Sequence, residues 1–475
     1  MTVQTYDLEA ARAELQALGD HYAATHHSPA LIWGVMCDGS LALSGHSGCR
    51  DDGAAPTTGT VFRIASMTKS FTAATVLRLR DDGVLALDDA VAELAAARPT
   101  ADSPPITLRH LLSMQSGITT DDPWADRHLD IAADDLDAVL AEGPSFAVVP
   151  GTRFNYSNLG YGVIGRVIER LTGERPQDLI DRLLIRPLDL QRTTWTRPDH
   201  DDWARPHRIE DGLAVADSAP LGDGALAPMG GMWSTIDDIV RLMAFFDDAF
   251  PAGDDDAGPI RRATRRELQQ VHRAADVTLT PETGEGLDHV PERVDAAGYG
   301  FGLQVVHDQR FGHIVGHSGG LPGYGSNMRW LPGRRIGAVA LANSTYAPMW
   351  LLTRRMLEVL DDNDLVPPVV VAVSEAVRRA AEDLVALVND WSDEGADALF
   401  ADNVALDETY ERRALQAGQL VSVHGRLTLQ RTEAEFATRG TAIAQATDGR
   451  EVRLRLTLSP QASARVQDYS ITVAE

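Results

Sequence analysis

The chain has 475 residues, of which 44% are hydrophobic and 24% charged, values typical of a soluble globular protein. Its formal net charge of −26 at pH 7 repels phosphate backbones and anionic lipid surfaces, which excludes nucleic acid and membranes as expected partners. This length is too great for one simple domain and predicts a large core with a smaller unit.

The N-terminal segment has the pattern of an amphipathic helix. Residues 1–20 carry acidic residues from position 7 onward and no unbroken apolar stretch, which is unlike a signal or transit peptide. No run of 18 apolar residues follows, so no membrane span is expected. Cys37 and Cys49 lack the spacing of a zinc site or disulfide framework and are expected to be reduced, with a disulfide between them as the alternative. Together these features favour a cytoplasmic protein.

Short apolar segments from both ends of the first 365 residues predict one antiparallel sheet. Residues 31–36 and 41–45 flank an Asp-Gly-Ser turn and form a predicted hairpin. From residue 299 onward, short apolar runs separated by Gly-Pro turns predict further antiparallel strands. The segment from residue 84 to about 290 is mostly helical in period. A sheet from both chain ends with a helical middle predicts an α+β sandwich.

The last hundred residues form a second predicted domain. The acidic and proline-rich stretch "DDNDLVPPVVV" follows a predicted helix at 349–360 and indicates a linker. We therefore expect domains at 1–365 and 366–475. A helical pattern near 374–391 and alternating runs such as "VRLRLTL" make the second one a small α+β domain, in which no catalytic constellation is recognisable.

The stretch "FRIASMTKSFTAA" contains Lys69, the only lysine of the chain, whereas the other 42 basic residues are arginine. Ser66 and Lys69 lie one turn apart on a helix predicted from about residue 66 to 80, and so share a face. A serine becomes a good nucleophile only when a base takes its proton, and lysine is a base only when its pKa falls from about 10.4 toward about 7–8. Arginine stays protonated at any workable pH. The retained lysine therefore indicates Ser66 as nucleophile and Lys69 as its base.

Two further motifs supply groups that such a nucleophile needs. Tyr156 and Asn158, in "FNYSNLGYG", can direct a phenol for proton relay and a carboxamide for substrate orientation into one cleft. His317, in "GHSGG" on a predicted edge strand, can polarise or position a substrate. A strand N–H near Gly320 and the N–H of Ser66 can form an oxyanion hole. Each motif alone is weak, because S-x-x-K occurs by chance and a strand histidine is usually a packing or surface residue.

Together and in this order, the motifs resemble the serine β-lactamase and penicillin-binding-protein superfamily, especially its class C β-lactamase, family VIII esterase and D-aminopeptidase branch. The resemblance runs from about residue 20 to 350 and includes "PGTRFNYSNLGYGVIGRVIERLTG", "GGMWSTIDDIVRLMAF" and "GHSGGLPGYGS". It implies a β-lactamase-like sandwich with the active site where sheet and helices meet. It further implies acylation of Ser66, proton handling by Lys69 and Tyr156, and contact between Asn158 and the acyl side chain.

One departure from the family pattern concerns the substrate. His317-Ser318-Gly319 stands where β-lactamases carry Lys-Thr-Gly, whose lysine favours a substrate carboxylate. Histidine is a weaker, pH-dependent cation, so the chain looks more like the esterase, amidase and transacylase branches. The lack of an export signal agrees, because cell-wall substrates lie outside the membrane.

We therefore expect a cytoplasmic serine hydrolase that acts on a small ester or amide through an acyl-enzyme, without metal or organic cofactor. His313 and His317 are four residues apart on a strand, too far to share a metal ion easily. The expected partner is a small-molecule acyl substrate, and assembly into a homo-oligomer stays open. The alternatives are transacylase or thioesterase-like transfer to an amine in small-molecule biosynthesis, and a non-catalytic scaffold.

The C-terminal domain resembles the cone-shaped NTF2-like α+β domains, mainly through "EGADALFADNVAL". A lipocalin-like barrel is the competing interpretation. Either could shape substrate access or pair two subunits.

Overall fold

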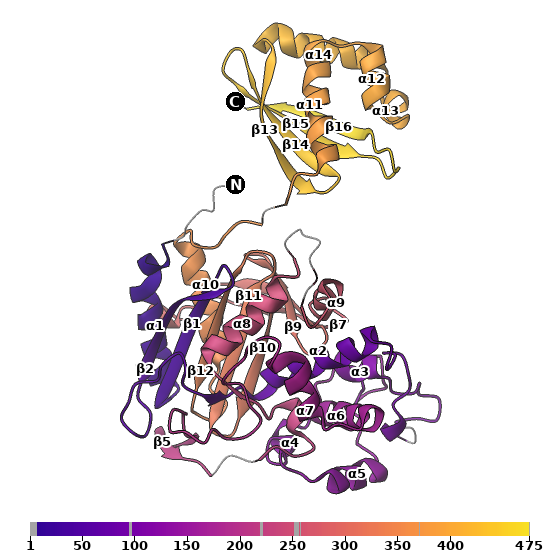
Figure 1. The fold of residues 1–475 in the computed structure, drawn as a ribbon. Coiled ribbons are helices and arrows are strands. Elements are labelled where there is room, and N and C mark those ends of the chain that lie inside the picture. Colours follow the sequence, from indigo (N-terminus) through magenta and orange to yellow (C-terminus); the bar gives the residue numbers. More distant parts are fainter. Residues whose placement is uncertain are drawn as a thin grey trace. The chain divides into compact units, whose positions relative to one another are not determined.

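The computed structural model describes residues 7–94, 97–218, 222–250, 256, 258–369 and 371–474. The chain divides into two compact units, residues 1–368 and 369–475 (Figure 1). The first unit contains an eight-stranded antiparallel sheet in the order β2-β1-β12-β11-β10-β9-β8-β7. Its strands are β1 Ala30–Cys37, β2 Ser40–Gly48, β7 Arg273–Thr280, β8 Arg293–Tyr299, β9 Gln304–Asp308, β10 Gly312–Leu321, β11 Tyr324–Leu331 and β12 Ile336–Ala342.

Helices cover both faces of this sheet. One face packs against α1 (Arg12–Thr25) and α10 (Met349–Asp362), and the other against α8 (Ile236–Asp247). Figure 1 shows the remaining helices from α2 to α7 gathered beside the sheet. These and the other short elements of the unit are η1 Leu8–Ala11, β3 Phe62–Arg63, η2 Ala65–Met67, α2 Thr68–Asp81, η3 Ala92–Leu94, α3 Leu108–Leu112, α4 Asp122–Ala125, α5 Ala133–Glu142, α6 Asn158–Thr172, α7 Pro176–Ile180, η4 Asp181–Ile185, β4 His207–Glu210, β5 Leu213–Ala216, η5 Ala227–Met229, β6 Trp233–Ser234, α9 Arg262–Leu268 and η6 Gly286–Asp288.

Strand β1 shows how the sheet buries both faces. Ile32 and Met36 belong to the apolar cluster that includes α8. The alternating residues Leu31, Trp33 and Val35 belong to the cluster that includes α1 and α10. Because successive side chains of a strand point to opposite faces, a strand covered on both sides has a continuous apolar sequence. Each face of the sheet therefore has its own core.

The sequence predictions for the first unit are mostly confirmed. The predicted hairpin is formed by β1 and β2, and the predicted α+β combination of a sheet with a helical middle is present. The prediction of helical structure up to about residue 290 is wrong at its end, because β7 and β8 extend the sheet. Val277 and Leu279 of β7 are 75% and 62% exposed. This strand is held by pairing with β8, so it lacks the buried pattern that identifies strands in a sequence.

Strand β10 is a central strand, not the edge strand predicted for the segment around His317. Its ladder to β9 ends at Gly316, whereas its ladder to β11 continues to Leu321. Among the described strands, residues 317–321 therefore have a neighbour on one side only. The segment before α2 lies close to this part of β10: a Cβ on Gly319 would clash with the Ile64 carbonyl oxygen. The end of β10 and the start of α2 thus meet at one place.

The second unit has a separate core. Its elements are α11 Glu375–Asn389, α12 Asp393–Leu399, α13 Asn403–Asp407, α14 Tyr410–His424, β13 Leu427–Phe436, β14 Arg439–Ala446, β15 Glu451–Leu458 and β16 Val466–Val473. The four strands form an antiparallel sheet in sequence order. Apolar residues of α11, such as Val377 and Leu384, share a buried cluster with Val452 and Leu454 of β15.

Two expectations about the whole chain can be compared with this structure. Within the described residues, no helix combines the length and the apolar character that crossing a membrane requires. Cys37 and Cys49 are both free, so the alternative of a disulfide between them is not realised.

Two glycines test how closely the sheet approaches α2. Both have left-handed backbones, with φ of +68° at Gly302 and +76° at Gly83. A Cβ on Gly302 would clash with the Lys69 carbonyl oxygen and lie 2.6 Å from Ala73 Cβ, whereas nothing lies within 4 Å of one on Gly83. We expect Gly83→Ala to lower the free energy of unfolding by about 1–2 kcal/mol, the cost of the left-handed backbone. Gly302→Ala should lower it by at least about 3 kcal/mol, because the neighbouring backbone must also move.

Urea unfolding followed by tryptophan fluorescence measures both changes, since every tryptophan except Trp391 lies in the first unit. Equal losses from the two substitutions would contradict the proposed close packing at Gly302.

Candidate active site

Ser66 lies in the 3-10 turn η2 that leads into α2. The preceding residue, Ala65, has φ of +48°, in the left-handed region that residues other than glycine rarely adopt. Such strained positions are found preferentially at functional sites. Ala65 and Met67 on either side are buried, whereas Ser66 is partly exposed. The turn therefore presents the Ser66 hydroxyl at the surface of an otherwise closed region.

Lys69 lies one turn after Ser66 and is fully buried. Its Nζ is 2.9 Å from Ser66 Oγ. It donates hydrogen bonds to Asn158 Oδ1 and to the Met229 carbonyl oxygen, each at 2.7 Å. Burial lowers the pKa of Lys69 to about 7. The amine therefore changes its charge near neutral pH.

The carboxylate of Asp122 fixes the orientation of the Asn158 amide. Asn158 Nδ2 donates to Asp122 Oδ1 at 2.6 Å. A carboxylate can only accept, so the amide nitrogen faces Asp122 and the amide oxygen faces Lys69. Asp121 accepts from the backbone N–H groups of Asn158 and Leu159, at 2.8 and 2.7 Å, and so holds the first turn of α6. These contacts place Asn158 against Lys69.

Asp126 is a third carboxylate beside the site and is 4% exposed. Burial raises the pKa of Asp126 to about 7, although its hydrogen bond from the Tyr346 hydroxyl, at 2.8 Å, lowers that pKa. The negative charges of Asp122, Asp126 and Asp121 raise the pKa of Lys69 and oppose the larger effect of burial. The charge on Lys69 is thus set by two competing influences.

Tyr156 lies just before α6 and shares a hydrogen bond with Ser66. The centre of its ring is 4.9 Å from Lys69 Nζ. Burial raises the pKa of Tyr156 well above its ordinary value of 10, so the phenol stays protonated at neutral pH. The structure therefore brings Ser66, Tyr156 and Asn158 together around the amine of Lys69.

His317 is buried in β10 and is 1% exposed. Nδ1 lies 2.6 Å from the Ser318 carbonyl oxygen, and Nε2 lies 2.8 Å from the Tyr299 hydroxyl. Because a carbonyl oxygen only accepts, Nδ1 carries the hydrogen and Nε2 accepts from Tyr299. Burial, together with the charge of Lys69, lowers the pKa of His317 to about 3. The expectation of a pH-dependent cation here is therefore wrong, because the ring is neutral at ordinary pH.

A cavity of about 410 Å³ opens at Ser66. Tyr156, His317 and Gly320 also line it, whereas Lys69 and Asn158 are fully buried behind its wall. A Cβ on Gly320 would lie 2.7 Å from the Tyr346 ring, so glycine keeps this part of the wall open. All six residues singled out in the sequence thus lie in or directly behind one wall.

Several groups of the site were not found from the sequence. Asp121 and Asp122 look like solvated loop acids in "TTDDPW", and only the fold places them against α6. Met229 contributes a backbone oxygen, which leaves no signal in a side-chain pattern. Tyr346 and Trp350 also line the cavity but lie far along the chain from every motif.

The histidines that suggested a metal have other partners. His313 Nε2 lies 3.1 Å from the Gln269 carbonyl oxygen, and its ring stacks on His307 at 4.9 Å. In the part of the chain that the structure describes, no group of three or more His, Cys, Asp or Glu residues is placed to hold a metal ion.

Residues 15–360 match the protein family described as Beta-lactamase. Penicillin-binding protein 4 of Amycolatopsis lactamdurans is 30% identical over 347 residues, which cover 70% of this chain and 86% of that protein. The D-alanyl-D-alanine-carboxypeptidase/endopeptidase AmpH of Escherichia coli (strain K12) is 27% identical over 289 residues, 60% of this chain and 71% of that protein. Esterase EstB of Burkholderia gladioli is 29% identical over 334 residues, 61% and 79% of the two chains.

Among solved structures, the octameric penicillin-binding protein homologue from Pyrococcus abyssi has the same fold, with a TM-score of 0.61. It is 17% identical and covers 97% of this chain and 99% of its own. The family match covers nearly all of the first unit, including the turn that carries Ser66 and Lys69. The chain therefore belongs to the β-lactamase family.

Proposed function

We propose that this chain is a serine hydrolase that forms an acyl-enzyme at Ser66 and hydrolyses a small ester or amide. The observation that carries the proposal is the 2.9 Å separation between Ser66 Oγ and the buried Lys69 Nζ at the wall of a cavity. Relatives described as an esterase and as a D-alanyl-D-alanine carboxypeptidase support an ester or an amide as substrate.

The hydrogen bonds of Lys69 support its role as the base. A neutral amine has two hydrogens and one lone pair. Asn158 Oδ1 and the Met229 carbonyl oxygen each accept one hydrogen from the amine. Neither oxygen carries a hydrogen that it could donate to the nitrogen lone pair. The lone pair is then left for Ser66 Oγ, the third neighbour of Nζ. Lys69 is thereby prepared to take the serine proton.

Tyr156 completes the proposed proton path. Ser66 Oγ attacks the carbonyl carbon of the substrate, and its proton passes to Lys69. Tyr156, hydrogen-bonded to Ser66 and protonated at neutral pH, relays a proton to the departing alcohol or amine. Water then attacks the acyl-enzyme and releases the acid. The backbone N–H groups of Ser66 and Gly320 are the proposed donors to the oxyanion that forms in both steps.

Acyl transfer to an amine is the second candidate, and the cavity wall contains the observation that favours it. Asp122 and Asp126 both line the cavity. Carboxylates attract a protonated amine and raise its local concentration beside the acyl-enzyme, where it attacks after giving its proton to neutral Lys69. The retention of Ser66, Lys69 and Tyr156 in contact with one another argues against a non-catalytic scaffold.

We further propose residues 1–365 as the catalytic domain and 366–475 as an NTF2-like accessory domain. Its helices come first and are followed by a sheet whose outer strands, β13 and β16, pair with no further strand in the described residues, apart from a single bridge between Val466 of β16 and Phe400. An open sheet favours the cone-shaped α+β domain over a closed lipocalin-like barrel. The octameric homologue aligns with 97% of this chain, which supports a homo-oligomer as a proposal for light scattering to test.

Because Lys69 is the only lysine, its charge can be followed directly. Protein labelled with [¹³C]lysine should give one side-chain Cε resonance, which titrates near pH 7 instead of near 10.5 because the amine is buried. NMR spectra recorded from pH 5 to pH 10 measure this midpoint. A midpoint above about pH 9 would contradict a neutral amine at Ser66.

The rate of acylation should rise with pH, because only neutral Lys69 accepts a proton. With a pKa of about 7, its neutral fraction rises about tenfold between pH 6 and pH 8, and so should acylation by a neutral p-nitrophenyl ester. Asp122→Asn should move the midpoint to lower pH, since removal of an anion lowers the pKa of Lys69. A shift of the midpoint to higher pH would contradict the expected effect of Asp122 on the pKa of Lys69.

Substitution of Ser66 and of Lys69 distinguishes a catalytic protein from a non-catalytic scaffold. Ser66→Ala should abolish covalent labelling by a fluorophosphonate, as measured by intact-protein mass. Lys69→Arg should keep a cation of similar length but slow acylation at least about a hundredfold, because arginine does not accept a proton. Labelling of Ser66→Ala at the wild-type rate would refute the proposed nucleophile.

A further inference from the structure

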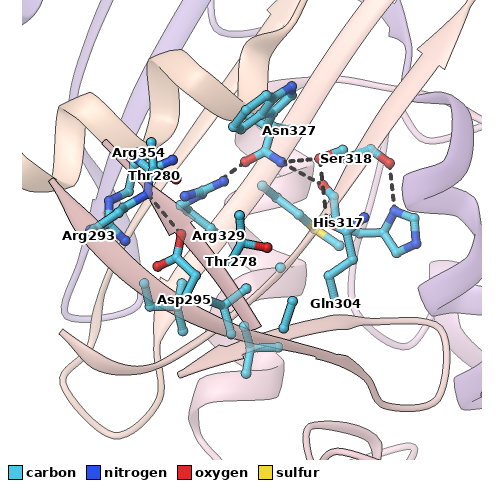
Figure 2. Close-up of a pocket in the computed structure, with 17 residues that line it drawn as sticks. Thr278, Thr280, Arg293, Asp295, Gln304, His317, Ser318, Asn327, Arg329 and Arg354 are labelled. Atoms are coloured by element: carbon cyan, nitrogen blue, oxygen red, sulfur yellow. Dashed lines mark hydrogen bonds and ion pairs between the residues drawn. The ribbon is translucent and has the colours of Figure 1, made fainter. Parts of the chain in front are cut away.

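A second cavity, of about 520 Å³, lies next to the catalytic one. The two cavities share Gln304, His317, Ser318 and Trp350 as lining residues. Figure 2 shows Gln304, His317 and Ser318 at one end of this second cavity and three arginines, Arg293, Arg329 and Arg354, toward the other. One end of the cavity therefore borders the catalytic site, and the other is cationic.

The arginines of α10 are balanced by Glu358 of the same helix and by Asp308 of β9. Arg354 pairs with Asp308 and, at 2.8 Å, with Glu358. Glu358 also pairs with Arg355. The two cations, Arg354 and Arg355, thus face the two anions Asp308 and Glu358. Because each desolvated charge has an opposite partner, these four residues leave no excess charge in the cavity.

Arg329 on β11 is different, because no carboxylate of the described residues lies within 4 Å of its guanidinium. Its Nε donates to Asn327 Oδ1 at 3.3 Å. Arg293 beside it is paired with Asp295 at 2.8 Å. Burial and the charges of Arg354 and Arg293 lower the pKa of Arg329 to about 9, although the more distant charges of Glu358 and Asp295 raise it, so Arg329 remains charged at neutral pH. This end of the cavity therefore has one uncompensated positive charge.

The rest of the cavity is suited to an apolar body with few polar atoms. Val306, Ile314 and Met328 provide apolar surface, and Thr278 and Thr280 provide hydroxyl groups near the arginines (Figure 2). One excess positive charge matches a monoanion better than a divalent phosphate, and a planar guanidinium matches the two oxygens of a carboxylate.

We propose that this cavity binds an organic monocarboxylate, with its carboxylate on Arg329 and its apolar body toward Ser318. The carboxylate could belong to the far end of the substrate, since the two cavities share a wall, or to a separate carboxylic acid. A carboxylate at the far end of the substrate presupposes the proposed function. Binding of a carboxylate at Arg329 does not presuppose it.

Binding is tested with hexanoate and its neutral analogue hexanamide, by calorimetry on the Ser66→Ala protein so that no reaction occurs. Hexanoate should bind at least about tenfold more tightly than hexanamide, the usual effect of a charge-assisted hydrogen bond. Arg329→Met, added to this protein, should remove the difference. Arg98→Met is the control, because it removes an exposed arginine of the same unit. Equal affinity for hexanoate and hexanamide would overturn the proposal, and that comparison needs no arginine variant to fold.

The source of the carboxylate is distinguished by two esters, p-nitrophenyl hexanoate and the mono-p-nitrophenyl ester of adipate. If the carboxylate belongs to the substrate, Arg329→Met should lower kcat/KM about tenfold for the adipate ester and less than about twofold for the hexanoate ester. If it belongs to a separate acid, both esters should respond alike while the preference for hexanoate over hexanamide persists in the Ser66→Ala protein. Failure of the wild type to hydrolyse either ester would count against the proposed function and leave the binding result unaffected.

Discussion

The contact between the Lys69 amine and the Ser66 hydroxyl is the interaction on which the rest of the site depends. It needs three parts of the chain at once: the turn into α2, the start of α6 with Asn158, and the backbone at Met229. Two acceptors hold the amine, and burial removes its charge near neutral pH. The surrounding carboxylates oppose this loss of charge, so a modest change in their number would shift the amine toward one protonation state.

The fold supplies this arrangement by letting backbones approach closely where the sheet meets the helices. Gly319 and Gly302 lie against Ile64 and Lys69, where a side chain on either glycine would clash with a carbonyl oxygen. β10 continues past the end of its ladder with β9, so its last residues face the serine turn instead of another strand. The opening at Ser66 is therefore a consequence of unequal strand lengths in the sheet.

Local patterns in the sequence were sufficient for part of this site. Ser66 and Lys69 are separated by one helical turn, so their proximity follows from a single element, and the apolar runs of β1 and β12 identify central strands. The neutral state of His317 was not predictable in the same way, because it depends on burial by distant elements. The role of Met229 rests on a backbone atom, and β7 depends on pairing with β8. In each of these cases the missing information is tertiary.

Burial has opposite consequences for the charge of two basic residues, Lys69 and Arg329. Burial lowers the pKa of Lys69 to about 7 and that of Arg329 to about 9. Because the ordinary pKa of arginine is higher than that of lysine, Arg329 remains a cation at neutral pH, whereas Lys69 becomes able to accept a proton. A chain that uses arginine at every other basic position thus keeps lysine where a charge must be lost. Arginine serves where a buried charge must persist, as at the cationic end of the second cavity.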